Sequence, residues 1–268
     1  MDQIPQYSLV LLAGVVAGVI NTLAGSGSLI TLPALIFLGL PANVANGTNR
    51  VGVVLQNIVA GATFKRSGSL DLRGAMLLSI PSVIGSIIGA QIAVNLDERL
   101  MRQVIGAVMV VMLIVMVLRP ERWLQGTLQS LPKSGFTWMQ GLSMFVIGLY
   151  GGFIQAGVGI FLLAALVLSI GYDLVRANAV KIVVILVFTF SSLLVFANNA
   201  QVDWVAGLVL GMGNMIGAGW AARKAVTKGA SWVRWVVLAT VALSAIYLLV
   251  PQETVDAALN SMLSGLVR

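Results

Sequence analysis

Cysteine and histidine are both absent from this 268-residue chain, and only 9% of its residues are charged. The absence of cysteine excludes disulfides, thiolate metal sites and cysteine nucleophiles. The absence of histidine removes the commonest metal ligand and the side chain that most often moves protons near neutral pH. Most membrane-enzyme chemistry loses its usual residues, so we predict a protein that is not an enzyme and that needs no metal or cofactor.

Acidic residues are scarce as well: 9 Asp and Glu stand against 16 Lys and Arg, which gives a net charge of +7. Such a surplus can indicate nucleic-acid binding. Here the basic residues are spread over short stretches between apolar runs, as membrane orientation signals usually are. We therefore predict no nucleic-acid partner.

Apolar residues fill the chain instead, with 59% hydrophobic residues and a mean hydropathy of +0.99. Soluble domains are about 45–50% apolar. One bilayer crossing needs about 20 apolar residues, so this length allows roughly eight to ten crossings. The sequence predicts an all-α polytopic protein of the lipid bilayer. No Lys or Arg precedes the first apolar run, so we expect that run to be a retained membrane segment and not a cleaved signal.

The apolar residues fall into ten segments, and two of these are too short to span a bilayer alone. The short segments are 28–40 and 158–170, and each follows a glycine-rich break. We therefore predict two broken or re-entrant helix pairs. The ten segments are 7–24, 28–40, 44–64, 74–95, 100–118, 138–156, 158–170, 174–197, 203–222 and 232–250.

An internal repeat is indicated when the chain is compared with itself at an offset of 132 residues. Glycine, asparagine and aspartate positions coincide at this offset, and they match by chance less easily than apolar residues do. We predict a first membrane repeat at 1–120, a cytoplasmic linker at 121–136 and a second membrane repeat at 137–268. The matched pairs include Gly25 with Gly157, Gly27 with Gly159, Asn46 with Asn178, Phe64 with Phe196 and Asp71 with Asp203.

The basic residues predict that the two repeats are inverted. The loop after the third segment carries Lys65, Arg66 and Arg73, whereas the matching stretch 198–203 has no Lys or Arg. Because short basic loops stay in the cytoplasm, the two matching loops should lie on opposite sides of the membrane. Both termini are then expected outside.

Ionisable side chains inside the apolar segments are positive. Every acidic residue lies in a terminus, in a loop or at the mouth of a segment, whereas Arg50 and Lys181 lie about two turns inside their segments. Intramembrane charges usually mark function, and a positive site suggests an anion. The alternative is that both side chains extend along apolar surface to the nearest interface.

The glycine breaks offer a second anion-binding feature. A helix that begins inside the membrane exposes free N–H groups and the positive end of its dipole. Glycine lets backbone approach a ligand closely, and serine adds hydroxyl donors. Tight helix packing is the alternative role for these glycines, and it is the expected role of Gly85, Gly89, Gly213 and Gly217. The candidate residues of the breaks are Gly25, Ser26, Gly27, Ser28, Gly157 and Gly159.

Amide and hydroxyl side chains gather near the breaks and the two cations. They could donate hydrogen bonds to an oxyanion, or they could tie neighbouring helices together. These candidate residues are Asn21, Asn46, Thr48, Asn49, Gln155 and Asn178. Asp71 and Asp203 are instead expected to cap the helices that follow them.

Four motifs together resemble the sulfite exporter TauE/SafE family. They are Gly14-Val-Val-Ala-Gly18, Ala24-Gly25-Ser-Gly27-Ser-Leu-Ile-Thr-Leu-Pro33-Ala-Leu, Leu38-Gly39-Leu-Pro41 and Ala45-Asn46-Gly47-Thr48-Asn49. The second half carries a weaker echo, in which Ala165 replaces Pro33 and Asp173 replaces Pro41. The resemblance implies a multi-pass permease of the cytoplasmic membrane that exports sulfite, sulfoacetate or a related sulfur anion.

The sequence therefore predicts a secondary transporter of small anions that exposes one central site to either side in turn. An inside-negative membrane would drive an anion outward without a coupled ion. An uptake carrier or a channel for another anion or polar solute stays open as the alternative, as does a structural subunit. The expected partners are a small anionic substrate and the bilayer, and a homodimer is left open.

Overall fold

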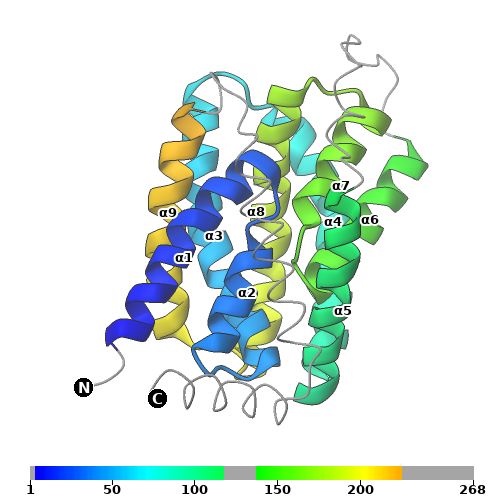
Figure 1. Ribbon diagram of the computed structural model, residues 1–268. Helices are drawn as coiled ribbons and strands as arrows, with labels where there is room; N and C mark the ends of the chain where they lie inside the picture. Colours follow the sequence, from blue (N-terminus) through cyan, green and yellow to red (C-terminus); the bar gives the residue numbers. More distant parts are fainter. Residues whose placement is uncertain (1–3, 118–136, 225–268) are drawn as a thin grey trace, which may run out of the picture.

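The computed structural model describes residues 4–117 and 137–224, and every regular element in these two ranges is a helix (Figure 1). The all-α polytopic class predicted from the sequence is confirmed. The predicted linker 121–136 and the tenth segment 232–250 lie outside the described residues. The helices are α1 (Ile4–Ala24), α2 (Ser28–Phe37), α3 (Ala42–Arg66), α4 (Leu72–Val94), α5 (Glu98–Val117), α6 (Trp138–Phe153), α7 (Val158–Ala164), α8 (Leu174–Asn198) and α9 (Trp204–Lys224), with a π-helix at Ala165–Ile170 that continues α7.

Four of these helices are long and apolar enough to cross a bilayer, at Gln6–Leu23, Leu72–Val94, Leu174–Asn198 and Trp204–Arg223. Ser28–Phe37 and Val158–Ile170 are apolar but too short, as the sequence predicted for the segments after the two breaks.

The distribution of side chains across α4 is the reverse of that in a soluble protein. Ile84 is 53% exposed, while Ser82 and Ser86 on the inner face are fully buried. Lipid tails are as apolar as isoleucine, so large apolar side chains lose nothing by facing outward, and small residues are left to bring helices together. This pattern fits a chain whose solvent is hydrocarbon.

Glycines bring the backbones of neighbouring helices into contact. On α4, a Cβ added to Gly85 or Gly89 would lie about 2 Å from a carbonyl oxygen of α6, at 2.2 Å and 2.0 Å. On α9, the same addition at Gly213 or Gly217 would lie 2.2 Å or 2.0 Å from a carbonyl oxygen of α1. The packing role predicted for these four glycines is therefore confirmed.

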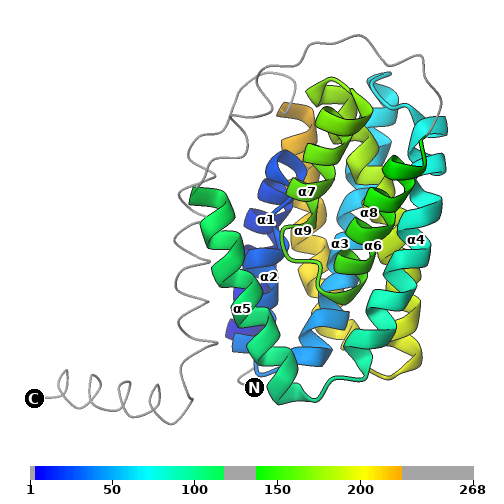
Figure 2. The same cartoon turned by 90° about the vertical axis from the view of Figure 1, so that its right-hand side faces the viewer.

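Helices α3 and α8 cross at the centre of the molecule. Each packs against a helix of the other half, α3 against α9 and α8 against α4, and the outer pairs are α1 with α9 and α6 with α4. The bounds of α8 are those of α3 shifted by 132 residues. Figures 1 and 2 show the α3–α4 loop and the α8–α9 loop at opposite ends of the molecule. These features are the ones that an inverted repeat requires, and the repeat itself stays a prediction.

Candidate functional site

The two glycine-rich breaks meet inside the helix bundle. The first separates α1 from α2 at Gly25–Gly27, and the second separates α6 from α7 at residues 154–157. The N–H of Gly159 donates to the carbonyl oxygen of Gly25 at 3.1 Å. A Cβ on Gly25 would lie 2.6 Å from the Cα of Gly159, so this crossing requires glycine on both sides. All residues of both breaks are buried.

Left-handed backbone conformation explains two of the four predicted break glycines. Gly25 has a φ of +76° and Gly157 a φ of +70°, values that side chains with a Cβ rarely adopt. Gly27 is the right-handed N-cap of α2, and a Cβ there would lie 2.3 Å from the carbonyl oxygen of Ala17. Gly159 lies in the first turn of α7 and not in the break itself.

Asn21 organises the first break. Its carbonyl oxygen accepts from the N–H of Gly25 at 2.9 Å and from the Nζ of Lys181 at 3.4 Å, and its Oδ1 accepts from the N–H of Gly27 at 3.4 Å. On α8, Asn178 donates from Nδ2 to the carbonyl oxygen of Thr22 at 3.0 Å. The last turn of α1 is thus held by a cation and an amide from the other half of the chain.

Asn49 connects α3 to the start of α2. Its Oδ1 accepts from the Oγ1 of Thr31 at 2.5 Å, and its Nδ2 donates to the Oγ of Ser28 at 3.2 Å. The side chains of Ser28 and Thr31 on α2 are therefore hydrogen-bonded within the protein. Thr31 was not among the predicted site residues, although it lies one turn after Ser28 and could have been found from that spacing.

Arg50 is fully buried against the second break. Its Nη1 donates to the carbonyl oxygen of Gly151 at 3.0 Å and to the Oγ of Ser192 at 2.9 Å. Its Nη2 donates to the carbonyl oxygens of Gly152 at 2.6 Å and Phe153 at 3.5 Å. These three carbonyls end α6, where the helix dipole is negative, so the guanidinium caps the broken helix.

Two further side chains complete the surroundings of Arg50. Asn46, one turn earlier on α3, donates from Nδ2 to the carbonyl oxygen of Phe153 at 2.8 Å. The ring of Phe196 lies 4.5 Å from the guanidinium carbon, which gives a cation–π contact. Phe196, which the repeat matches with Phe64, therefore contacts a buried charge. The sequence did not predict this role.

Gln155 lies in the second break and donates from Nε2 to the Oγ1 of Thr189. Thr189 and Ser192 are fully buried on α8, and neither was predicted as a site residue. The available signal was three hydroxyl residues, Thr189, Ser191 and Ser192, in the apolar second half of α8. The side-chain partners of Thr189 and Ser192 are far away in the sequence, so the pattern alone could not give their function.

Thr48 lies away from the breaks. Its Oγ1 accepts from the backbone N–H of Asp203 at 2.8 Å, which anchors the α8–α9 loop on α3. Asp203 also caps α9 by accepting from the N–H of Ala206 at 2.9 Å, and Asp71 caps α4 by accepting from the N–H of Gly74 at 2.9 Å. The capping roles predicted for both aspartates are confirmed.

Asp71 has a second partner at the end of the molecule where the α3–α4 loop lies. The hydroxyl of Tyr172, which precedes α8, donates to its Oδ2 at 2.6 Å. This hydrogen bond and that from Gly74 hold the pKa of the Asp71 carboxyl below its usual 3.8. A capping aspartate of one half is therefore tied to the other half of the chain.

No acidic side chain in the described part of the chain pairs with Arg50 or Lys181. The acids of 4–117 and 137–224 all lie at or directly before the first residue of a helix, and the one ion pair found there joins Arg176 to Asp173 on the exposed start of α8. Within the same ranges, no cluster of His, Cys, Asp or Glu could hold a metal ion. The centre therefore carries two buried positive groups that carboxylates do not balance.

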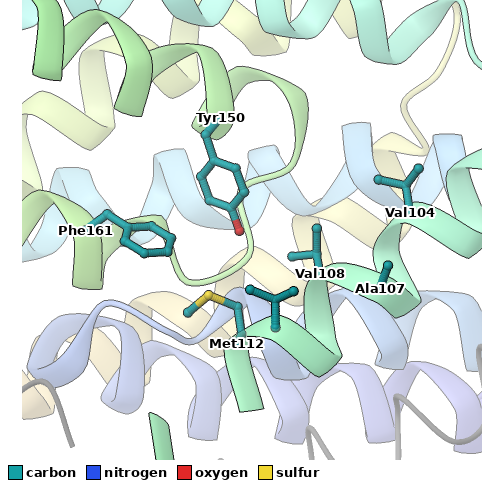
Figure 3. A pocket seen from close by; sticks show the side chains of 7 residues that line it. Val104, Ala107, Val108, Met112, Tyr150 and Phe161 are labelled. Carbon is teal, nitrogen blue, oxygen red and sulfur yellow. The ribbon is translucent and has the colours of Figure 1, made fainter. Parts of the chain in front are cut away.

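An apolar pocket of about 310 Å³ lies beside the second break, between α5, α6 and α7 (Figure 3). Its walls include Val108 and Met112 on α5 and Phe161 on α7. Tyr150 is the only lining residue with a polar side-chain group, and its hydroxyl donates to the carbonyl oxygen of Ala156 at 2.5 Å. A cavity without free donors suits hydrocarbon and not an anion.

Apolar outer faces, paired helix breaks and a polar, positively charged centre define a polytopic membrane transport protein. The chain belongs to the sulfite exporter TauE/SafE family, whose model matches residues 10–248. The resemblance seen in the sequence motifs is therefore confirmed.

Curated relatives carry transporter names. The chain is 27% identical to a probable membrane transporter protein of Haemophilus influenzae over 86% of its own length and 89% of the relative. It is 27% identical to the probable membrane transporter protein YfcA of Escherichia coli K12, with 85% and 84% covered, and 25% identical to ORF9 of a Sinorhizobium species, with 88% and 90% covered. The relatives are named as probable transporters and the family as exporters, which agrees with the prediction that this chain is not an enzyme. No solved structure matches it significantly.

Proposed function

We propose that this chain exports a small sulfur oxyanion, sulfite or an organosulfonate such as sulfoacetate, across the cytoplasmic membrane. The family model that it matches is named for sulfite export. Transport would proceed by alternating access, in which a central site opens to one side of the membrane and then to the other. The proposal rests above all on one observation, the two buried cations at the breaks, which have no acidic partner among the described residues.

The charge of the centre favours an anion over a cation or a neutral solute. Arg50 and Lys181 are both fully buried, and a charge at this depth costs roughly 2.5–3.5 kcal/mol on insertion scales. A bound oxyanion would offset part of that cost by neutralising positive charge. A cation would meet two like charges and would be repelled.

Burial of the breaks supports a mechanism that closes around its substrate. Every residue of both breaks is buried in this conformation, so an anion can reach them only after helices move. The two inverted halves would alternate between an opening toward the α3–α4 loop and one toward the α8–α9 loop. An inside-negative potential would favour the outward direction by about 2.3 kcal/mol per charge per 100 mV.

Substrate counterflow in proteoliposomes tests the proposal. Purified protein is reconstituted with internal sulfite, and exchange is measured against external sulfite, sulfoacetate, sulfate, a neutral solute and Na⁺. We expect exchange of sulfite or sulfoacetate and none of Na⁺. Exchange of Na⁺ or the neutral solute alone would contradict the proposal.

Lys181→Gln gives the charge-removal variant for the same assay, and Arg176→Gln is its matched control. Both side chains start from α8, but Arg176 is exposed and Lys181 is buried. We expect Lys181→Gln to lose most of the anion exchange and Arg176→Gln to keep it. Equal exchange by both variants would remove the buried charge from the proposed mechanism.

A further inference from the structure

The two buried cations differ in how far the protein itself uses their donors. We infer that the transported oxyanion binds at the first break, on Lys181, Ser26 and Thr22, and that Arg50 is a positioning residue that holds the second break in shape. The inference rests on the proposed function and assigns its substrate to one of the two helix breaks.

Arg50 has little capacity left for a ligand. A guanidinium has five N–H donors. Four contacts with protein oxygens use both terminal nitrogens, and only the Nε is left without a partner. The aromatic ring of Phe196 covers the guanidinium as well. An anion could take the fork of Arg50 only if α6 lost its C-terminal cap.

Lys181, in contrast, has donors that the described residues leave unpaired. An ammonium group has three N–H donors. Among the described residues, the Nζ of Lys181 meets one acceptor, the carbonyl oxygen of Asn21, at a distance of 3.4 Å. The side chain is nevertheless fully buried. A charge with spare donors and no water contact is the group that gains most from an incoming oxyanion.

Two buried hydroxyl groups without partners lie in the same part of the molecule. Ser26 is 0% exposed and Thr22 2% exposed, and neither side-chain oxygen has a hydrogen-bond partner among the described residues. Ser26 stands between Gly25 and Gly27, which both donate to Asn21. Thr22 follows Asn21 directly, and Lys181 contacts Asn21 too. The three donors therefore belong to a residue that contacts Asn21, to the neighbour of Asn21 in the chain and to the residue between the two glycines that donate to it.

Apart from the Nε of Arg50, the groups at the second break that have no partner among the described residues are acceptors. The atoms without partners there include the Oε1 of Gln155 and the Oδ1 of Asn46, which are acceptors and would repel an oxyanion. At the first break, the Oδ1 of Asn178 is also free, which suits the O–H of a protonated oxyanion such as hydrogensulfite. A sulfite or sulfonate group has three oxygens, and the ammonium and two hydroxyls supply a donor for each.

Sulfite binding to the purified full-length protein, measured by calorimetric titration, tests the assignment. We expect Ser26→Ala and Thr22→Val each to weaken sulfite binding about tenfold, the effect of one lost hydrogen bond to a charged acceptor. Lys181→Gln should weaken it about a hundredfold or more, and Lys181→Arg should recover part of the loss. Ser79→Ala, which removes a buried hydroxyl on α4, is the matched control and should bind like the wild type.

Thr189→Val applies the same hydroxyl removal to the second break, where we expect binding within about twofold of the wild type. Thermal melting of each variant shows whether it is folded, and the conservative Ser26→Ala and Thr22→Val changes carry the test if Lys181→Gln is not. Wild-type affinity in both of those variants, or an equal loss in Thr189→Val, would overturn the assignment while the proposed function stands. A wild-type protein that binds no sulfur oxyanion would instead overturn the proposed function.

Discussion

At the scale of single residues, the partners of Arg50 change what its burial means. Its position inside an apolar segment predicted an unbalanced charge that waits for a ligand. In the structure, the balance comes from carbonyl oxygens at the end of α6, about a hundred residues further along the chain. Such partners cannot be found by looking for carboxylates in the same segment. A broken helix inside a membrane has a negative end as well as a positive one, and both need compensation.

Arg50→Gln should destabilise the protein by about 3 kcal/mol, because removing the cation leaves buried carbonyl oxygens without donors. Arg50→Lys should recover part of this, since one ammonium can serve some of the same carbonyls. Thermal melting of the purified protein measures the effect. Lys65→Gln, a charge removal at the exposed end of the same helix, is the control and should melt like the wild type. A stable Arg50→Gln variant that binds no anion would show that Arg50 is a ligand.

Tyr172→Phe should make the protein less stable above about pH 4, and the difference from the wild type should shrink as the pH falls further. The depressed pKa of Asp71 contributes stability above the carboxyl's unfolded pKa, and this contribution is lost as the pH falls through the folded pKa. The largest cause of the depression is the hydrogen bond from Tyr172, so without it the contribution above the unfolded pKa is smaller and less of it is left to lose as the pH falls. Melting temperatures between about pH 2 and 6 give the comparison. Tyr7→Phe on α1 is the control, and an identical acid profile for Tyr172→Phe and wild type would refute the expectation.

At the scale of elements, the crossing of the two breaks depends on glycine for two separable reasons. Gly39 has a φ of +97° with nothing within 4 Å of an added Cβ, whereas Gly25 combines a φ of +76° with a backbone contact at 2.6 Å. Gly39→Ala should therefore lower the free energy of unfolding by only about 1–2 kcal/mol, the cost of placing alanine in the left-handed conformation.

Gly25→Ala should destabilise the protein clearly more than Gly39→Ala. The added Cβ would meet backbone atoms of Gly159, which cannot move aside. We expect it to lose sulfite exchange in proteoliposomes as well, while Gly39→Ala retains exchange. Thermal melting and the exchange assay measure the two effects on the same samples. Equal melting temperatures for the two variants would mean that the breaks do not cross at Gly25.

Most helix bounds could be predicted from the sequence, and the reason is local. The predicted segments 28–40, 44–64 and 174–197 lie close to α2, α3 and α8, because apolar runs end where Gly39 allows a turn or where Asp173 caps a helix. The π-helix at Ala165–Ile170 could not be predicted in this way. It begins at the position where the first half has Pro33, and Pro33 itself sits inside a regular α-helix.

The candidate site was predicted by composition and not by geometry. Asn21, Ser26 and Lys181 lie together at the first break, as their polarity inside apolar segments suggested. Thr48 has the same polarity but anchors a loop elsewhere. What separates these cases is which helix of the other half packs against each side chain, and a sequence without its fold does not contain that information.

At the scale of the whole molecule, inversion of the two halves predicts where each loop is exposed. Because the chain has no cysteine, single thiols can be introduced by Ser67→Cys in the α3–α4 loop and Asn199→Cys in the α8–α9 loop, both at exposed positions. In intact cells, a membrane-impermeant maleimide should label the thiol at position 199 directly. It should label the one at position 67 only after permeabilisation, since Lys65 and Arg66 keep that loop in the cytoplasm. Labelling of both thiols from the same side would contradict the inverted repeat.

Two phenylalanines matched by the repeat are buried near the ends of the two central helices. Phe64 is buried near the end of α3 against Ala179 and Ile182 of α8, and Phe196 is buried near the end of α8 beside Arg50. Helices α3 and α8 end at opposite ends of the molecule (Figure 1), and each phenylalanine lies two positions before the end of its helix.

The central claim, that an anion moves outward through this centre under the membrane potential, is tested most directly by voltage-driven efflux. Proteoliposomes loaded with sulfite are given an interior-negative potential through a potassium gradient and valinomycin, and the released sulfite is measured. The account predicts that efflux is faster than at zero potential, that it slows when the potential is reversed, and that Lys181→Gln abolishes the difference while Arg176→Gln keeps it. Sulfite efflux that is the same at all three potentials, or its absence from wild-type vesicles, would contradict the account.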